Sequence, residues 1–332
     1  MLDRPGVVVI TGASGGVGRA AAREFARRGA DVGLLARNDE ALAVARREVE
    51  ALGRRACAVP VDVADARSVS NAADVVAGTL GPIDVWVNNA MVTVVSPVAQ
   101  LDADELRRVT DVTYHGTVYG TLAALRHMRP RNCGTIVQVG SALAYRSIPL
   151  QAAYCGAKAA TRAFTDSLRS ELIRDRSGVR VTMVHMPALN TPQFDWCRTR
   201  MHRKPQPVAP IFQPEVAARA IAWAATHRRR ELFVGMSTLL AVTGQKLAPG
   251  WIDRHLARAG YDGQLSEELV EQGRRDNLWE PLSGDVGAHG RFDDRAHGHS
   301  AGLQLSTHRV EVGALLLALL SLGAAAFLRK RP

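Results

Sequence analysis

The stretch VVVITGASGGVG, residues 7–18, decides the fold of this 332-residue chain. Its first part, VVVIT (Val7 to Thr11), is a continuous β-branched apolar run, typical of a strand buried on both faces of a parallel sheet. Its second part, TGASGGVG (Thr11 to Gly18), is a glycine turn that opens a helical pattern reaching about Arg28. A strand, a glycine turn and a helix in this order predict a dinucleotide site, because glycine lets the backbone approach a pyrophosphate at the helix N-terminus.

The glycine turn supplies the first candidate cofactor-binding residues, and Gly12, Gly16 and Gly18 carry the tight bend. The other members of the predicted site in this turn are Thr11, Ser14, Gly15 and Val17. The alternative is a glycine turn that binds no ligand.

Six more strand-like runs alternate with helical patterns along the chain. This alternation predicts an α/β fold, a Rossmann-type doubly wound parallel sheet of about seven strands flanked by helices. The longest predicted helices cover about Ala103 to Met128 and the segment that ends near Asp175. The six strand runs are Asp31 to Arg37, Ala56 to Val63, Ile83 to Ala90, Gly134 to Ser141, Val179 to Met186 and Glu231 to Gly235.

Residues at the ends of these strands favour NADP(H) over NAD(H). NAD-binding folds place an acidic residue at the end of the second strand, whereas Arg37 stands there in this chain and suits a 2′-phosphate. An arginine on an exposed turn is the alternative. Asp62 and Val63 end the third strand, where Asp62 either contacts adenine or caps the helix beginning near Asp65. Asn88 and Asn89, followed by Ala90, predict hydrogen bonds that join neighbouring strands beside the cofactor.

Ser141, Tyr154 and Lys158 are the candidate catalytic residues. Ser141 ends the fifth strand, at the sheet edge where ligands bind in open α/β folds. Tyr154 and Lys158 are four residues apart, which places both side chains on one face of a helix. We expect the Lys158 charge to lower the pKa of the Tyr154 phenol, so that it exchanges a proton near neutral pH. Taken alone, the spacing favours a tyrosine beside a solvated lysine, and the other motifs of the chain reverse that preference.

Together these motifs resemble the short-chain dehydrogenase/reductases, over about residues 4 to 236. The resemblance rests on T-G-x-x-x-G-x-G at Thr11 to Gly18, on Asp62, on Asn88-Asn89-Ala90, on Ser141 and on Tyr154-x-x-x-Lys158. It implies that Tyr154 is the proton donor or base, that Lys158 holds the nicotinamide ribose, and that Ser141 binds the substrate oxygen. Asn89 would line the cofactor site through its backbone.

Further site candidates accompany this resemblance. Ala90, Pro187 and Thr191 are additional cofactor-binding candidates. Thr113, a further catalytic candidate, stands where the family commonly has a catalytic asparagine, and Met91 stands where it has glycine. Thr113 can keep the main-chain contact of that asparagine but not its side-chain contact, which is compatible with a slower or rewired proton relay and does not require loss of activity. Homo-oligomers are common in the family.

The chain after the sixth strand divides into a lid and a tail. Residues 188–213 are rich in proline and basic residues and are interpreted as a lid, with Phe194, Trp196, Met201 and Phe212 as its apolar lining. The predicted catalytic domain covers residues 1–262, and residues 263–309 are interpreted as a variable tail with a flexible linker. The histidines of the tail match no ligand spacing, so no metal is expected.

The end of the chain, residues 310–332, is predicted as a hydrophobic helix with a basic end. Residues 312–328 hold 17 uncharged residues, the low end of a membrane span. We expect attachment to the cytoplasmic face of a membrane. The basic end conflicts with the positive-inside tendency for a full span, so the segment crosses or lies in one leaflet. A buried or oligomerising helix in a soluble cytoplasmic protein is the alternative.

The composition limits the remaining choices. The net charge is +10, yet no aromatic residues are interleaved with a basic stripe, so a nucleic-acid partner is not expected. Only four of the 42 basic residues are lysines, which suggests a bacterial source rich in GC. The four cysteines form no C-x-x-C pair and are interpreted as reduced thiols.

The predicted function is interconversion of a carbonyl and an alcohol by an NADP(H)-dependent oxidoreductase, on an apolar small-molecule substrate. Two alternatives remain. One is a non-catalytic NADP-binding scaffold, and the other is a nucleotide-sugar epimerase, which the NNA stretch disfavours.

Overall fold

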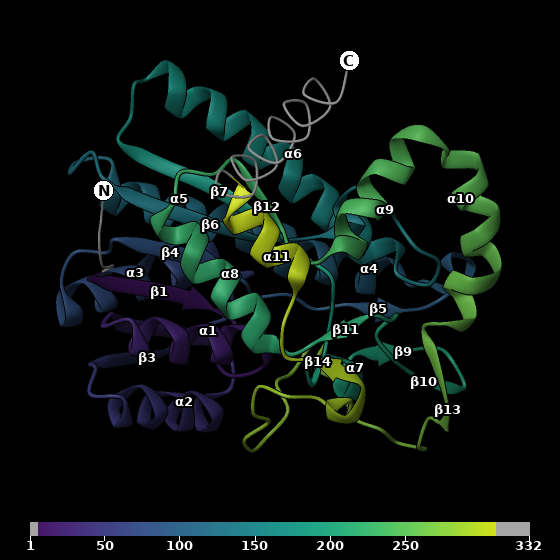
Figure 1. Cartoon of the computed structure of the whole chain (residues 1–332). Coiled ribbons are helices and arrows are strands. Elements are labelled where there is room, and N and C mark those ends of the chain that lie inside the picture. Colours follow the sequence, from purple (N-terminus) through teal and green to yellow (C-terminus); the bar gives the residue numbers. More distant parts are fainter. Residues whose placement is uncertain (1–5, 310–332) are drawn as a thin grey trace, which may run out of the picture.

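The protein, represented by a computed structural model, is described over residues 6–309 and is built on a seven-stranded parallel sheet. The strand order is β12-β7-β6-β4-β1-β2-β3, with the sequence reversing its direction between β1 and β4 (Figure 1). The predicted Rossmann-type fold is therefore confirmed. The strands are β1 (Val7–Thr11), β2 (Asp31–Ala36), β3 (Ala56–Pro60), β4 (Val85–Asn88), β6 (Gly134–Ser141), β7 (Val179–Met186) and β12 (Glu231–Phe233).

A layer of helices covers each face of the sheet, and a cluster of buried hydrophobic side chains lies between each layer and the sheet. One cluster joins the sheet to α1, α2 and α8, and the other joins it to α3, α4, α5 and α6. Alanines line the contact between α1 and α8, so the two helices lie close together. The helices are α1 (Gly16–Arg27), α2 (Asp39–Ala51), α3 (Ala66–Leu80), α4 (Ala103–Thr110), α5 (Gly116–Met128), α6 (Ala152–Arg174) and α8 (Pro214–Thr226).

Side-chain caps fix where several helices begin. Asn38 accepts a hydrogen bond from the Ala41 N–H and starts α2, as its position predicts. Asp65 caps α3 in the same way. The helix predicted from Ala103 to Met128 is interrupted by a π-helical turn, Asp111–His115, which separates α4 from α5.

The region predicted as a lid consists of short elements beside the carboxyl ends of the strands. Together with β5 (Val94–Val95), β13 (Leu265–Leu269) and β14 (Ala296–His297), its strands form three small sheets. Its elements are β8 (Ala188–Leu189), α7 (Gln193–Trp196), β9 (Arg198–Thr199), β10 (Arg203–Pro205) and β11 (Ile211–Phe212).

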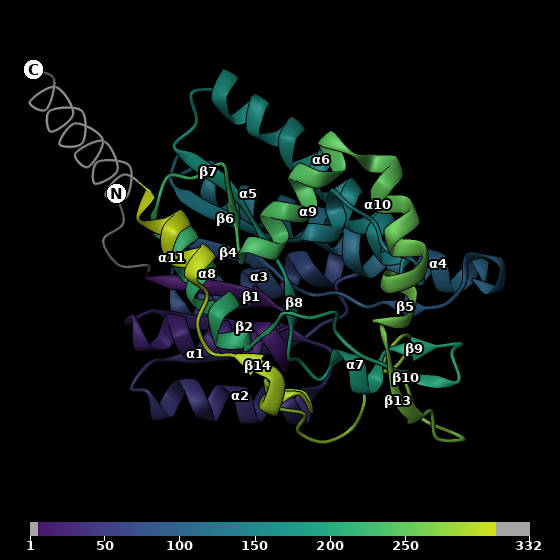
Figure 2. The same cartoon turned by 45° about the vertical axis from the view of Figure 1, so that its right-hand side comes forward.

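The tail after β12 is more ordered than the composition predicts. It contains α9 (Met236–Leu247), α10 (Pro249–His255), a π-helical turn (Leu256–Gly260) and, after β13 and β14, α11 (Ala301–Thr307). Figure 2 shows the chain after β13 returning past α7 toward α11. Within this tail, for which a flexible linker is expected, residues 277–293 bond to the Rossmann domain through backbone carbonyls, the Asp285 carboxylate and the His289 ring.

The predicted hydrophobic helix, residues 312–328, lies outside the described residues. Among residues 6–309, no helix combines the length and the apolar character needed to cross a bilayer.

Candidate active site

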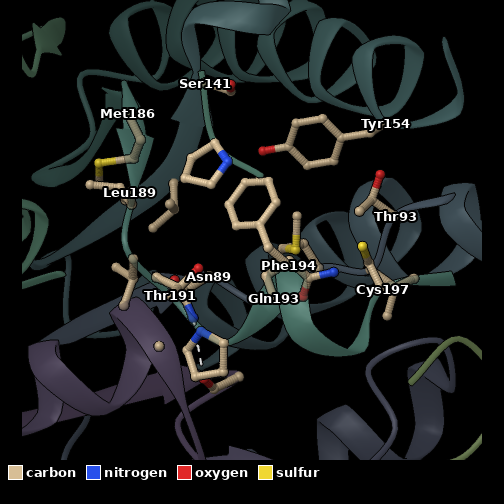
Figure 3. Close-up of a pocket in the computed structure, with 18 of the residues that line it drawn as sticks. Asn89, Thr93, Ser141, Tyr154, Met186, Leu189, Thr191, Gln193, Phe194 and Cys197 are labelled. Atoms are coloured by element: carbon tan, nitrogen blue, oxygen red, sulfur yellow. Dashed lines mark hydrogen bonds between the residues drawn. The ribbon is translucent and has the colours of Figure 1, made fainter. Parts of the chain in front are cut away.

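A cavity of about 450 Å³ runs along the carboxyl ends of the sheet strands, a size within the ~300–1000 Å³ of ligand pockets. It extends from the glycine turn to Ser141 and Tyr154, and residues of α7 such as Gln193 and Phe194 form the wall facing Tyr154 (Figure 3). Most of the residues singled out in the sequence line it. These are Gly12, Ser14, Gly15, Gly16, Val17, Arg37, Asp62, Val63, Asn89, Ala90, Ser141, Tyr154, Lys158, Pro187 and Thr191.

The glycine turn forms a cradle that side chains would fill. A Cβ atom on Gly12 would lie 2.9 Å from the Cα of Ala90, and Gly12 has a φ of +67°. Gly18 does not line the cavity, because a Cβ there would lie 2.1 Å from the carbonyl oxygen of Gly12. Gly18 therefore lets α1 pack against the turn, and the open backbone fits the pyrophosphate of a dinucleotide.

The asparagine pair joins three strands behind this cradle. The Asn88 side chain donates to Gln138 at 2.9 Å and to Thr121 at 3.0 Å, and the Asn89 side chain donates to the Thr11 carbonyl at 2.9 Å. Thr11 is buried and accepts from the Asn89 N–H at 2.9 Å, so it supports the site without lining the cavity. The predicted tie between strands is confirmed by these bonds.

Arg37 and Asp62 lie at the other end of the cavity, after β2 and β3. Asp62 does not cap α3; it accepts from the Ala64 N–H at 3.0 Å and from Arg108 at 2.5 Å. Arg37 donates to the backbone carbonyls of Asn277 at 2.5 Å and Trp279 at 2.6 Å. Arg37 is therefore bound by the tail and is not an arginine on a free surface turn.

Ser141, Tyr154 and Lys158 meet at the centre of the cavity. Ser141 ends β6, and the two other residues lie one turn apart on α6. The Lys158 Nζ atom lies 5.7 Å from the centre of the Tyr154 ring and donates to the Val139 carbonyl at 2.7 Å. Figure 3 shows the Tyr154 ring projecting into the cavity. The side chains needed for proton transfer therefore share one space.

The electrostatics of this trio differ from the sequence-based expectation. Burial raises the pKa of the Tyr154 phenol, and the neighbouring Ser141 hydroxyl only partly opposes that shift. Burial also lowers the pKa of Lys158 to about 8. The expected lowering of the tyrosine pKa by the lysine charge is thus wrong, because burial dominates the shift and the Lys158 charge is not among its causes. Tyr154 is accordingly a proton donor at neutral pH.

Thr113 lies outside the cavity. Its side chain is fully buried in the π-helical turn, where the hydroxyl donates to the Val92 carbonyl at 3.1 Å and accepts from the Val92 N–H at 3.2 Å. Its own carbonyl accepts from Thr117 at 3.0 Å. Thr113 therefore positions Val92, which lines the cavity, and does not itself reach the site.

Two of the four lid residues expected to line the cavity do so. Phe194 and Trp196 line the cavity, and Figure 3 shows Phe194 beneath Tyr154. Met201 instead packs beside Val95, Leu150 and Cys197, and Phe212 joins the main core.

Other lining residues were missed in the sequence. They include Val92, Thr93 and Val95 after β4; Leu143, Ile148 and Gln151 between β6 and the body of α6; Ser237, Thr238, Leu256 and Gly260 in the α9–α10 region; and Asn277, Pro281, Leu282 and Val286 in the tail. In the tail, residues 277–287 mix polar and apolar side chains with proline and glycine, and this composition does not predict a place beside the cofactor site.

The described residues contain no cluster of histidine, cysteine, aspartate or glutamate able to hold a metal ion. The fold and the site together define a dinucleotide-binding oxidoreductase with a Ser–Tyr–Lys centre.

Comparison with known proteins gives the family. The family model for short chain dehydrogenases matches residues 6–200. An uncharacterized oxidoreductase, YxnA of Bacillus subtilis (strain 168), is 34% identical over 263 residues, which cover 79% of this chain and 74% of the relative. This protein belongs to the short-chain dehydrogenase/reductase family and is an NAD(P)-dependent oxidoreductase.

Solved structures agree with this assignment. A short-chain dehydrogenase from Streptomyces avermitilis superposes with a TM-score of 0.65 at 28% identity, covering 78% of this chain and 97% of the other. An alcohol dehydrogenase from the archaeon Thermococcus sibiricus, complexed with 5-hydroxy-NADP, has a TM-score of 0.60 at 26% identity and covers 69% of this chain and 95% of the other. Between about a fifth and a third of this chain is thus left uncovered by these two structures.

Proposed function

We propose that this protein reduces the carbonyl of an apolar, uncharged small molecule, or oxidises the corresponding alcohol, with NADP(H). The lining of the cavity carries this proposal. Its charged side chains in the described structure are Arg37, Asp62 and Lys158, which belong to the cofactor end or the catalytic trio. Around Tyr154 the wall is apolar, formed by residues such as Ile148, Leu189 and Phe194. A charged substrate would be desolvated there without a partner, which is costly.

The chain's own residues provide the acid–base part of the reaction. Bound NADPH supplies the hydride that reduces the carbonyl carbon. Tyr154, whose raised pKa keeps the phenol protonated, donates its proton to the carbonyl oxygen. Ser141 donates a hydrogen bond to the same oxygen and stabilises the charge that develops on it. Lys158 holds the nicotinamide ribose, and its positive charge favours the phenolate that remains on Tyr154.

Arg37 supports NADP(H) over NAD(H). A guanidinium has five N–H donors and binds phosphate in a bidentate way. The hydrogen bonds of Arg37 to Asn277 and Trp279 use its two terminal nitrogens and leave other donors. Solved neighbours hold either cofactor, an alcohol dehydrogenase with an NADP derivative and a xylitol dehydrogenase with NAD+, so the preference rests on Arg37.

The proposal is tested with purified protein and a panel of apolar ketones and aldehydes. NADPH oxidation should require Tyr154, so Tyr154→Phe should lower turnover at least ~100-fold, a typical contribution of general acid catalysis. NADPH binding should be retained in that variant. Tyr119→Phe, in α5 and outside the cavity lining, is the matched control and should keep full activity. Equal turnover by Tyr154→Phe and wild type would refute the mechanism, whereas binding without turnover across the panel would favour the scaffold alternative.

We also propose that the protein works at a membrane surface. Five large hydrophobic side chains on α9 and α10 are exposed: Met236, Leu239, Leu240, Leu247 and Trp251. The same region supplies Ser237 and Thr238 to the cavity, so an apolar substrate could enter from lipid. Full-length protein should float with phosphatidylglycerol vesicles, and Leu240→Asp with Trp251→Asp should weaken this binding. Unchanged flotation would show that α9 and α10 do not contact lipid.

A further inference from the structure

The last part of the described chain lies against the cofactor site. Asn277, Pro281, Leu282 and Val286 line the same cavity as the glycine turn, although the family match ends at residue 200. We propose that residues 277–287, named the strap here, form the outer wall of the cofactor site over its adenosine half and must open to admit or release the cofactor. The proposal rests on the dinucleotide binding that the proposed function requires.

The first contact of the strap is with the glycine turn itself. The N–H of Gly16, the first residue of α1, donates to the Gly287 carbonyl at 3.0 Å. A Cβ atom on Gly15 would lie 3.1 Å from Val286 and 3.3 Å from Trp196. The outer side of the turn is therefore covered by the strap and by α7.

A buried arginine latches the strap to the Rossmann domain. Arg19 in α1 is 1% exposed and lies between two carboxylates, with Glu48 at 2.9 Å and Asp285 at 2.5 Å. Its terminal nitrogen also donates to the Ser14 carbonyl at 3.2 Å, within the glycine turn. A buried charge needs such partners, so the strap carboxylate of Asp285 contributes to holding α1 and the turn together.

A second set of contacts fixes the strap at the end of β2. Arg37 donates to two carbonyls at the start of the strap, as described above. The Asn38 side chain donates to the Leu282 carbonyl at 2.5 Å and to the Gly284 carbonyl at 3.0 Å. The residues that close the strap are thus those at which a Rossmann fold recognises the adenosine ribose and its substituents.

The strap is also tied to the lid. The Asn277 N–H donates to the Trp196 carbonyl at 3.0 Å, and Arg274 donates to the carbonyls of Asp195 and Cys197, each at 2.9 Å. Gly284 and Gly287 have φ values of +81° and +65°, which let the strap bend around the turn. Contacts also hold the chain just after the strap, since Ala288 is buried and the Phe292 N–H donates to the Asn190 side chain at 3.0 Å. The strap is therefore anchored on both sides, and its middle, around Asp285, is the part that opens.

The experiment weakens the latch without removing the charge compensation of Arg19. In Asp285→Asn, Arg19 keeps Glu48, and Asp285 is itself 39% exposed, so the fold should survive. Asp175→Asn is the matched control, because Asp175 pairs with Arg129 at 3.1 Å on the surface and outside the cavity. Hydrogen exchange of the strap amides is measured first, and NADPH and NADH association and dissociation then follow by stopped-flow fluorescence.

We expect faster exchange of the strap amides in Asp285→Asn, and association and dissociation rate constants for NADPH raised together by at least about fivefold. Bound NADPH should protect the strap amides of the wild type more than NADH does, because Arg37 can bind the 2′-phosphate and the strap together. Asp175→Asn should match the wild type within about twofold. Unchanged rates in a variant whose strap amides exchange faster would overturn the proposal. Tighter binding with unchanged dissociation would also overturn it, since the strap would then occupy the site instead of covering it.

Leu282→Ala keeps the test decisive if Asp285→Asn fails to fold or does not loosen the strap. It shortens a lining side chain and leaves the latch intact, so NADPH dissociation should accelerate at least about threefold, and an unchanged rate would overturn the proposal. A protein that binds NADPH with these rates but reduces no carbonyl would refute the proposed function and support the strap. A protein that binds no dinucleotide would refute both.

Discussion

Replacing Lys158 with methionine should make the protein more stable and less active. Lys158 is 2% exposed, and burial lowers its pKa from 10.5 to about 8. Since one pKa unit corresponds to about 1.4 kcal/mol, keeping this ammonium charged in the fold costs roughly 3 kcal/mol at pH 7. Methionine removes that cost and fills a similar volume. It also removes the hydrogen bond to Val139, a loss of about 1–2 kcal/mol.

Subtracting the lost hydrogen bond from the removed cost, we expect Lys158→Met to raise the free energy of unfolding by about 1–2 kcal/mol at pH 7. For a chain of this size, that corresponds to a few degrees in Tm. The gain in stability shrinks as the pH rises through a defined window. Below about pH 8 the lysine is charged in both the folded and the unfolded chain, so the full cost applies. Between about 8 and 10.5 the folded chain releases its proton first, and the stability of the wild type rises with pH. By pH 9.5 the cost should be roughly half its value at pH 7.

The assay is urea unfolding of cofactor-free protein at pH 7 and pH 9.5, with Lys246→Met as the control. Lys246 lies exposed on α9, so its replacement should change stability by less than about 0.5 kcal/mol at either pH. Turnover by Lys158→Met should be lost, which separates stability from function. The reasoning fails if Lys158→Met is no more stable than wild type at pH 7 and the difference does not shrink at pH 9.5.

Two further substitutions test the supports of the site. Gly18→Ala should abolish NADPH binding and lower stability by about 1–3 kcal/mol, because its Cβ would meet the Gly12 carbonyl at 2.1 Å. Gly78→Ala in α3 is the control, because an added Cβ there would meet no atom within 4 Å, and it should raise the free energy of unfolding by about 0.5–1 kcal/mol. If urea unfolding shows the same change in stability for both variants, Gly18 does not have the packing role inferred here. Thr113→Val should lower the free energy of unfolding by about 1–3 kcal/mol, because it leaves the N–H and the carbonyl of Val92 without their hydrogen-bond partner. Thr113→Ser keeps both hydrogen bonds. If thermal unfolding finds the two variants equally stable, Thr113 does not position Val92 in the way inferred.

The sequence by itself determined the features that depend on neighbours along the chain. The β-branched run at Val7–Thr11, the glycine turn after it and the cap at Asn38 act within a few residues, so the Rossmann-type sheet could be predicted. The spacing of Tyr154 and Lys158 is likewise a local property of one helix. Ser141 could be placed beside them because parallel strands bring their carboxyl ends to one edge.

Only the tertiary structure decided the electrostatics of the trio and the role of the tail. The pKa values of Tyr154 and Lys158 depend on burial by segments from the whole chain, and no spacing reports that burial. The contact between Arg37 and Trp279 joins residues 242 positions apart. The tail carbonyls that bind Arg37 and Asn38 belong to the backbone, which every residue carries. These backbone contacts leave no side-chain pattern, and the Asp285 carboxylate meets Arg19 across 266 positions of the chain, so the place of the tail beside the cofactor site emerged only when the chain was folded.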